Sequence, residues 1–260
     1  MFLRKLILSI FLLSFFTNGS FSAEKQEKLL TQAWSFNGFF GKFDRASLQR
    51  GYQVYAEVCA SCHSMNLLSY RNLSEVGGPS FSEEEVKAIA SKVEVLDGPN
   101  DSGEMFKRPG KPSDKFASPF TNEKAARAAN GGAYPPDMSV LVKARAGGAD
   151  YIYSVLMGYE DKPPKNIKLE DGVYYNKYMS GNKIKMAKPL NKDSVNYSDG
   201  TAATEEQLSK DVVTFLTWAS EPTLEARKRI GFKTVIYLLI LTVLVYLVKK
   251  KIWLRIEPKV

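Results

Sequence analysis

The only histidine and the only two cysteines of this 260-residue chain fall within five consecutive residues, Cys59-Ala60-Ser61-Cys62-His63. This C-x-x-C-H pattern is typical of covalent haem attachment, in which each thiol forms a thioether bond to the porphyrin. The histidine after the second cysteine is placed to bind the haem iron from one side. If a haem is fixed here, the rest of the chain has to fold around it.

Two other kinds of site use a C-x-x-C pair, namely redox-active thiols and one half of a zinc site. A zinc site needs further Cys or His ligands, and the sequence holds none outside the motif. A redox-active thiol pair does not require a histidine at the next position. The composition therefore favours one covalently bound haem c over both alternatives.

The formal net charge of +8 is concentrated at the two ends of the chain. Residues 23–226 hold 25 Lys and Arg against 27 Asp and Glu, whereas nine basic residues occur from Arg227 onward. This distribution is typical of membrane targeting. It argues against a nucleic-acid-binding surface, so we expect no nucleic acid among the partners.

Residues 1–22 have the composition of a secretory signal peptide. Arg4 and Lys5 precede an apolar run over residues 6–16, and small polar residues come after it. The run is short for a membrane span, which favours removal over an uncleaved anchor. Ser20 and Ser22 supply small residues at the expected cleavage site, which we place after Ser22.

A second apolar run covers residues 230–248 and is succeeded by three lysines, Lys249-Lys250-Lys251. Nineteen helical residues span roughly 28 Å, close to the thickness of the hydrocarbon core. A signal peptide exports the chain behind it, so the basic tail is expected on the cytoplasmic side. We therefore predict a periplasmic haem domain at 23–226, a transmembrane anchor at 227–250 and a cytoplasmic tail at 251–260, in a bacterial inner membrane.

Apolar residues repeated at three- and four-residue steps predict a helix capped by Asp44 that runs through Val58 into the haem motif. Further helices are expected over residues 83–92, 139–146, 150–159 and 208–219. The last comes after a predicted capping box at Thr204-Glu205-Glu206-Gln207, and Pro222 is predicted to start the membrane helix. The predicted fold is all-α, with long loops at 72–130 and 161–198 and one C-terminal transmembrane helix. The aromatic residues of segment 23–42 suggest no role.

One histidine leaves the opposite axial position of the haem iron open, and its occupant separates electron carriers from gas-binding or catalytic haems. With no second histidine, methionine is the candidate ligand. Met65 lies too close to His63 to reach the opposite face, and Met157 falls in a predicted helix as a core residue. The residues alone leave four candidates in irregular segments: Met105, Met138, Met179 and Met186.

Segments along nearly the whole exported region and the anchor resemble the cytochrome c1 family, the haem subunits of quinol–cytochrome c oxidoreductases. They succeed one another in the order found in that family, and the fold implied is a cytochrome c-like haem domain. The segments are Arg50-Gly51-Tyr52-Gln53-Val54-Tyr55, Ser64-Met65, Gly98-Pro99-Asn100, Gly103-Glu104-Met105-Phe106, Arg108-Pro109-Gly110-Lys111, Ala125-Ala126-Arg127-Ala128-Ala129-Asn130, Pro135-Pro136-Asp137, Lys143-Ala144-Arg145, Gly147-Gly148, Asp211-Val212-Val213 and Trp218-Ala219-Ser220-Glu221-Pro222.

The resemblance implies that Met186, within Ile184-Lys185-Met186-Ala187-Lys188-Pro189-Leu190, is the second axial ligand to the iron beside His63. Met138 is then expected in the pocket wall. Lys185 stands where the family often has a small residue. Some bacterial members brace the methionine loop with an extra cysteine pair, which this chain lacks, so packing and Pro189 must hold Met186.

The resemblance also implies donors for the haem propionates. Arg145 matches the arginine that binds a propionate, and Tyr151 matches a tyrosine near the same edge. Arg127 is a weaker alternative that also fits a solvated helix position. Three further residues match positions lining the haem pocket, namely Asn130, Ala133 and Pro136.

The function implied by the resemblance is electron transfer, with no catalysis on this subunit alone. The haem would take electrons from the Rieske iron-sulfur protein and pass them to a cytochrome c. The chain would belong to a dimeric complex that includes cytochrome b, and its anchor would contact membrane lipid. One alternative is a free, membrane-tethered cytochrome c shuttle, against which the long segment 72–130 argues. Another is a haem sensor or peroxidase-like enzyme with a labile sixth ligand, which would bind carbon monoxide when reduced.

Overall fold

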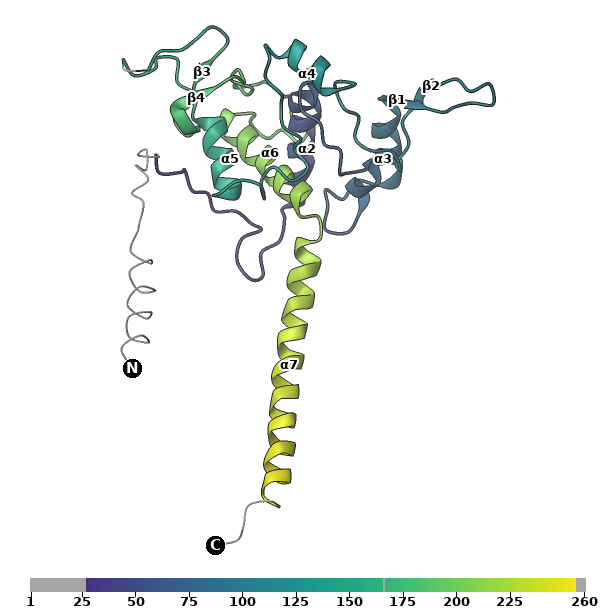
Figure 1. The fold of residues 1–260 in the computed structure, drawn as a ribbon, viewed down its shortest axis with the longest axis vertical. Coiled ribbons are helices and arrows are strands. Elements are labelled where there is room, and N and C mark those ends of the chain that lie inside the picture. Colours follow the sequence, from purple (N-terminus) through teal and green to yellow (C-terminus); the bar gives the residue numbers. More distant parts are fainter. Residues whose placement is uncertain (1–26, 166, 256–260) are drawn as a thin grey trace, which may run out of the picture.

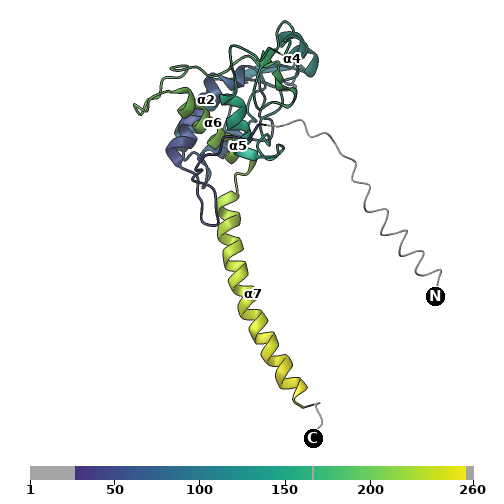
Figure 2. The same cartoon turned by 90° about the vertical axis from the view of Figure 1, so that its left-hand side faces the viewer.

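The computed structural model describes residues 27–165 and 167–255. It consists of a domain of short helices and long loops from which one long helix projects (Figures 1 and 2). The predicted signal peptide at 1–22 and the end of the predicted tail, 256–260, lie outside the described residues.

Helices α2 (Arg45–Glu57) and α6 (Glu205–Ser220) pack against each other at the centre of the domain. Asp44 caps α2 as predicted, because its carboxylate accepts a hydrogen bond from the Ala46 amide at 3.2 Å. The two backbones meet at Gly51, where an added Cβ would lie 2.1 Å from the carbonyl oxygen of Asp211. Only glycine permits this close approach.

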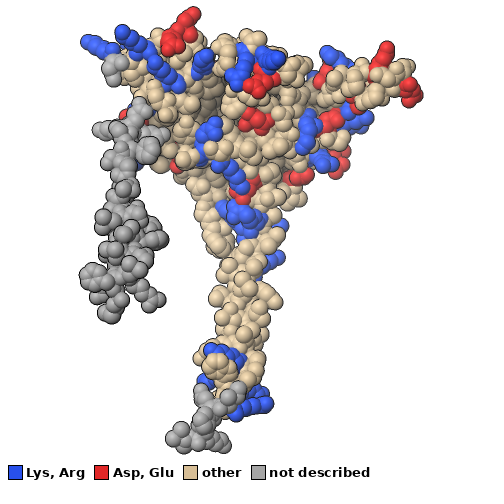
Figure 3. Space-filling model, viewed as in Figure 1, with Lys and Arg blue, Asp and Glu red and all other residues tan. Residues whose placement is uncertain are grey.

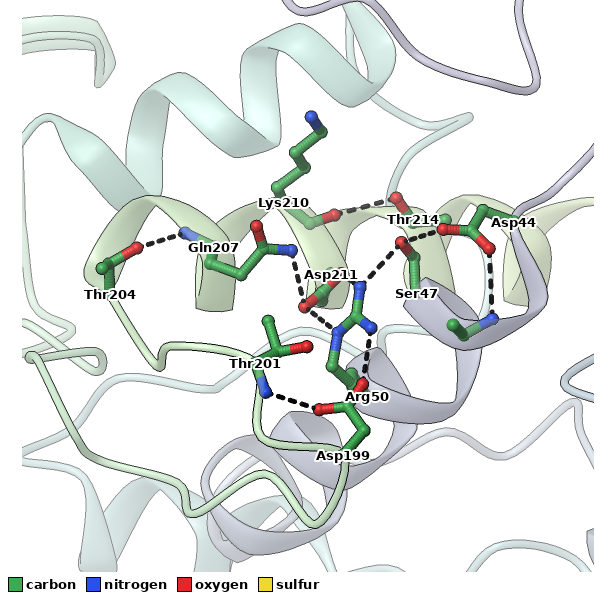
Figure 4. A network of polar contacts seen from close by, with 11 residues as sticks. Asp44, Ser47, Arg50, Asp199, Thr201, Thr204, Gln207, Lys210, Asp211 and Thr214 are labelled. Carbon is green, nitrogen blue, oxygen red and sulfur yellow. Dashed lines mark hydrogen bonds and ion pairs between the residues drawn. The ribbon is translucent and has the colours of Figure 1, made fainter.

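A polar network joins the same two helices beside this crossing (Figure 4). The Arg50 guanidinium donates from Nε to Asp211 Oδ2 at 2.8 Å and from Nη2 to Asp211 Oδ1 at 3.1 Å. Its Nη1 donates to Asp199 at 2.8 Å, and Gln207 adds a bond to Asp211 at 3.0 Å. The Asp211 side chain is fully buried, so its charge depends on these donors.

The remaining helices and strands are short, except for the last helix. The 3-10 turns are η2 (Cys59–Ser61), η3 (Tyr70–Ser74) and η4 (Ser180–Asn182). The α-helices are α3 (Glu83–Ser91), α4 (Glu123–Ala129), α5 (Gly148–Met157) and α7 (Leu224–Trp253). Two antiparallel hairpins pair β1 (Glu94–Asp97) with β2 (Phe106–Pro109) and β3 (Tyr174–Tyr175) with β4 (Lys183–Ile184).

The predicted helix over residues 139–146 is wrong, because this segment forms successive turns. The Asp137 carboxylate accepts a hydrogen bond from the Ser139 amide at 2.8 Å, and the Ser139 hydroxyl accepts one from the Leu67 amide at 3.0 Å. Gly147 then takes a φ of 86°, a left-handed conformation that starts α5 in a new direction. These local bonds replace a regular helix.

Two predicted helix starts need smaller corrections. Thr204 caps α6 by accepting a hydrogen bond from the Gln207 amide at 3.1 Å. The Gln207 side chain, however, bonds Asp211 instead of returning to Thr204, so only half of the predicted capping box forms. Helix α7 begins at Leu224, with Thr223 as its N-cap, so Pro222 precedes the helix instead of starting it.

Residues 27–42, which we call the N-terminal arm, pack along α5. The indole Nε1 of Trp34 donates to Asp150 at 2.6 Å, and its ring meets Tyr153 edge to face with 6.0 Å between centroids. The Leu30 amide adds a hydrogen bond to the Ser154 hydroxyl at 2.9 Å. Trp34 is 6% exposed and belongs to the hydrophobic core. The arm is therefore an integral part of the haem domain.

Helix α7 is long and apolar enough to cross a membrane, and the side chains of its apolar window are not buried against the rest of the protein. Its first turn is tied to the domain through Glu225, which pairs with Arg45 at 2.8 Å and accepts a hydrogen bond from the Phe43 amide at 2.9 Å. Figure 3 shows Lys and Arg near both ends of this helix and few charges between them. This arrangement is typical of a membrane span.

Candidate haem site

The C-x-x-C-H motif forms a tight turn directly after α2. The amides of Cys62 and His63 both donate to the carbonyl oxygen of Cys59, at 3.1 and 2.9 Å. The two cysteines are half-buried free thiols. A helix that ends in this turn therefore presents two thiols and one imidazole from a single short segment.

Hydrogen bonding determines which nitrogen of His63 is available to a metal. Its Nδ1 lies 2.8 Å from the carbonyl oxygen of Pro136, which can only accept, so Nδ1 carries the proton. The lone pair then resides on Nε2, and orientation of a ligating histidine through its other nitrogen is usual at metal sites. Burial lowers the pKa of His63, which keeps the imidazole neutral. These properties fit an axial ligand to haem iron.

Asp137 fixes the segment that holds this histidine. Its carboxylate accepts hydrogen bonds from the Ser64 hydroxyl, the Asn66 amide and the Ser139 amide, each at 2.8 Å. Burial alone would raise the pKa of Asp137, but these hydrogen bonds hold it below its usual value. Sequence reasoning assigned Asp137 no role, although an aspartate directly after two prolines is a common turn signal.

The thiol of Cys59 lacks the properties of a redox-active cysteine. Burial, with a smaller contribution from Cys62, raises its pKa to about 12, whereas reactive thiols have lowered pKa values. Within residues 27–165 and 167–255, no group of three or more His, Cys, Asp or Glu side chains could hold a metal ion. Both alternatives to haem attachment are therefore disfavoured by the structure.

The loop that carries Met186 is bonded to two other segments of the domain. The Tyr159 hydroxyl, just after α5, donates to the carbonyl oxygen of Met186 at 3.0 Å. The Lys185 ammonium donates to the carbonyl oxygen of Gly131 at 3.3 Å, in the segment that leads to Pro136. Lys185 thus joins the Met186 loop to the segment that leads to Pro136. Like Asp137, Tyr159 contributes to the site although the sequence did not indicate it.

The other methionines occupy different environments. Met138 and Met65 are buried in the core, and Met105 is 54% exposed beside the β1–β2 hairpin. Met157 packs against the core from the last residue of α5, as expected. Met179 is half-buried, and its sulfur accepts a hydrogen bond from the Tyr151 hydroxyl at 3.3 Å. Met186 is also half-buried.

The two candidate propionate-binding arginines differ in their existing partners. Arg127 pairs with Glu123 at 2.7 Å, donates to the Gly132 carbonyl at 3.1 Å and lies over the Tyr134 ring. Arg145 is exposed, and its guanidinium bonds the adjacent Ala144 carbonyl at 3.1 Å. No carboxylate in the described part of the chain pairs with Arg145. Its guanidinium is therefore the better placed of the two to bind an added carboxylate.

The remaining pocket residues lie in the segment between α4 and Pro136, the hydrogen-bond partner of His63. Asn130 is half-buried and donates from its side chain to the Ala126 carbonyl at 2.7 Å, closing the end of α4. Ala133 is half-buried, and its amide donates to the Asn130 carbonyl at 3.0 Å. Pro136 contributes its carbonyl to His63. The structure thus places Asn130, Ala133 and Pro136 along one segment that reaches the histidine.

These features define a class of protein: a helical domain built around a haem-attachment turn, with a long apolar C-terminal helix. A family model described as the Cytochrome C1 family matches residues 34–256. The chain belongs to the cytochrome c1 family. The residues matched by the family model include the whole candidate haem site, from Cys59 to Met186.

Individual relatives support the same assignment. The chain is 53% identical over 228 residues to "Cytochrome c1 2, heme protein, mitochondrial" of Arabidopsis thaliana, covering 87% of this chain and 73% of that protein. It is 46% identical over 237 residues to "Cytochrome c1" of Rhodospirillum rubrum, covering 85% and 86%. It is 51% identical over 248 residues to "Cytochrome b/c1" of Bradyrhizobium diazoefficiens, covering 88% of this chain but only 36% of that longer protein.

Family membership confirms several expectations from the sequence. The fold is a mostly helical haem domain with one long apolar C-terminal helix. The cofactor is haem, for which Cys59, Cys62 and His63 form the attachment motif. The function is that of a haem electron carrier in a cytochrome bc1 complex, and not of an enzyme acting alone.

Proposed function

We propose that this chain is a cytochrome c1 of bacterial type that receives electrons from a Rieske iron-sulfur protein and passes them to a cytochrome c. The observation that carries the proposal is the state of His63, neutral and buried, with Nδ1 held by Pro136 and Nε2 free for iron. Covalently attached haem supplies one-electron chemistry, and a His/Met ligand pair raises its potential into the range of such a relay.

In this proposal His63 and Met186 would bind the haem iron, and Cys59 and Cys62 would form the thioether bonds. Met186 is chosen over Met179 because its loop is bonded to the segment that holds His63, through Lys185 and Gly131. The sulfur of Met179 already accepts the Tyr151 hydroxyl. With His63 and Met186 both bound to the iron, dioxygen and other small ligands would be excluded from it.

Arg145 is proposed to bind a haem propionate, with Tyr151 beside it. An arginine without a carboxylate partner can form two parallel hydrogen bonds to one propionate. Asn130, Ala133 and Pro136 are proposed to line the pocket, where they exclude water from the ring. These residues hold and orient the cofactor; no proton transfer or bond cleavage is required of them.

The proposed arrangement in the cell rests on the two apolar segments. A signal peptide at 1–22 exports the haem domain at 23–226 to the periplasm, the anchor at 227–250 crosses the inner membrane, and residues 251–260 remain in the cytoplasm. The proposed neighbours in the membrane are cytochrome b and lipid, within a dimeric complex. The relative named "Cytochrome b/c1" unites both names in one longer chain, which supports this partner.

The experiment that tests the ligand assignment compares the visible spectra of wild type, Met186→Leu and Met179→Leu, reduced, with and without carbon monoxide. We expect wild type and Met179→Leu to ignore the gas, because their iron keeps six ligands. Met186→Leu should bind it and show a lowered reduction potential. Carbon monoxide binding by wild type would instead favour a sensor or peroxidase-like function, and binding by Met179→Leu alone would move the ligand to Met179.

A further inference from the structure

Residues 36–41 of the N-terminal arm form a loop that extends from the domain beside the first turns of α7 (Figures 1 and 2). Phe39 and Phe40, at its tip, are 57% and 75% exposed. Their rings meet edge to face at 5.0 Å, and both meet Phe232 of α7 in the same manner, at 5.8 and 5.7 Å. We refer to Phe39, Phe40 and Phe232 as the aromatic foot.

The loop is fixed to α7 by a single lysine. The Lys228 ammonium donates to the carbonyl oxygens of Phe36 at 2.6 Å, Gly38 at 2.7 Å and Gly41 at 3.4 Å. At the root of the loop, the Phe36 ring packs between those of Trp34 and Phe43, with centroids 5.4 and 5.2 Å away. The loop with the exposed rings is therefore fixed to α7 by Lys228 and to the domain by Phe36. In an isolated domain, water would surround these rings.

The position of the foot along α7 identifies its surroundings. Phe232 comes after the basic run Arg227-Lys228-Arg229 and stands at the start of the apolar stretch 230–248. Figure 3 shows the corresponding change from Lys and Arg below the domain to uncharged surface along the helix. In a membrane span, this change falls at the level of the lipid headgroups. Exposed Phe side chains of membrane-surface segments are buried at the boundary between headgroups and acyl chains, and Lys and Arg beside them reach toward the phosphates.

We propose that the aromatic foot inserts into the headgroup region of the lipid bilayer and gives the haem domain a second attachment to the membrane. Because Glu225 bonds Arg45 and Phe43, the domain and α7 move together, and a single membrane helix would leave them free to tilt as one body relative to the bilayer. The foot removes this freedom, because the same arm packs through Trp34 onto α5, which carries Tyr151 of the haem site. The orientation of the haem site relative to the membrane is thereby fixed. The inference requires that α7 cross the membrane, but not that any particular partner accept the electron.

The test places a nitroxide spin label on Phe40→Cys in the full-length haem-loaded protein, reconstituted in vesicles of phosphatidylcholine and phosphatidylglycerol. Leu96→Cys, which is 66% exposed on the β1–β2 hairpin, is the matched control. The unmutated protein should take no label if both native thiols are bound to haem. For each label we compare its accessibility to dioxygen, which dissolves in lipid, with its accessibility to a water-soluble nickel chelate. We expect the ratio of oxygen to nickel accessibility to be severalfold higher for the label at 40 than for the label at 96.

Two outcomes would overturn the proposal. Equal nickel accessibility at the two positions would mean that the foot lies in water, and protection of position 40 from both reagents would mean that protein covers it. A second variant tests the attachment of the loop: adding Lys228→Met to the labelled Phe40→Cys protein should increase label mobility by releasing three carbonyl groups. An unchanged spectrum would show that Lys228 does not hold the loop.

Discussion

Asp211 forms a buried ion pair between the two central helices, α2 and α6. It is fully buried in α6, and a buried charge is costly unless donors satisfy it. Arg50 supplies two of these donors from α2. The ion pair thus links the helix that presents the haem motif to the helix that supports it.

Replacing Arg50 by Met should leave the Asp211 carboxylate buried with only Gln207 as a side-chain donor from this network. Removing one partner of a buried ion pair typically costs about 3–5 kcal/mol. Because Gln207 remains, we expect a loss of about 3 kcal/mol in the free energy of unfolding. The measurement is denaturant unfolding of the full-length protein in detergent.

Asp199→Asn is the matched control for this prediction. Asp199 pairs with the same guanidinium at 2.8 Å, but its side chain is 42% exposed, so solvent screens the interaction. We expect Asp199→Asn to have nearly the same free energy of unfolding as wild type. Equal losses for Arg50→Met and Asp199→Asn would show that burial of Asp211 does not determine the strength of the network.

The haem-attachment residues were predictable because their chemistry depends on sequence spacing alone. Cys59, Cys62 and His63 lie in one turn, and their roles are set by the motif. The contributions of Asp137 and Tyr159 were not predictable, since each depends on a contact with a segment distant in the sequence or on an irregular turn. Such contacts leave no periodic signal.

Among the larger elements, helices with an apolar face and a capping residue were predicted close to their observed bounds. Helix α2 shows this clearly, with Asp44 at its start and the haem motif at its end. The prediction of a helix over 139–146 was wrong because local hydrogen bonds at Asp137 and Ser139 and the left-handed Gly147 hold the segment in turns, in which Val142 is buried but Val140 is exposed. The sequence predicted only a loop where the β1–β2 hairpin forms, because its alternation is weak and its faces are largely exposed.

The β1–β2 hairpin is fixed to the domain by Arg108, a residue of β2. Its guanidinium bonds Asp97 of β1 and forms two bonds with Asp114, at 2.6 and 3.0 Å. The bonds from Arg108 are the main reason that the pKa of Asp114 falls from 3.8 to about 2. The predicted loop therefore contains a hairpin with a defined electrostatic attachment.

This attachment predicts a pH dependence. Between pH 3.8 and about 2, the unfolded chain binds a proton at Asp114 that the folded chain does not, so stability is lost as the pH falls through this window. Above it, the contribution is fully present. We expect Asp114→Asn to have a lower thermal midpoint than wild type at pH 5. Between about pH 4 and pH 2, its thermal midpoint should fall less than that of wild type, because the variant has no carboxylate to protonate at this position.

Thermal unfolding of the full-length protein at these pH values provides the measurement. Glu94→Gln is the control on the same hairpin, because Glu94 pairs with Lys107 at 3.1 Å and both side chains are largely exposed. The control should match wild type at every pH. An Asp114→Asn curve parallel to that of wild type would contradict the assigned role of Arg108.

At the scale of the whole molecule, the domain and α7 are joined at several points and not through a flexible linker. Glu225 holds the start of α7 to Arg45 and Phe43, and Lys228 holds the arm. Under the proposed membrane arrangement, the direction of α7 therefore determines on which side the haem site lies. Basic residues flank both ends of the helix, so their distribution alone does not decide the orientation.

The orientation can be measured with two variants of the haem-loaded protein that each add one cysteine, Leu96→Cys in the domain and Lys251→Cys at the end of α7. Because a signal peptide exports the segment behind it, we expect a membrane-impermeant maleimide to label Leu96→Cys on intact spheroplasts. Lys251→Cys should react only after lysis, since the end of α7 then faces the cytoplasm. The reverse pattern would place the haem domain in the cytoplasm, where the proposed exchange of electrons with periplasmic partners could not take place.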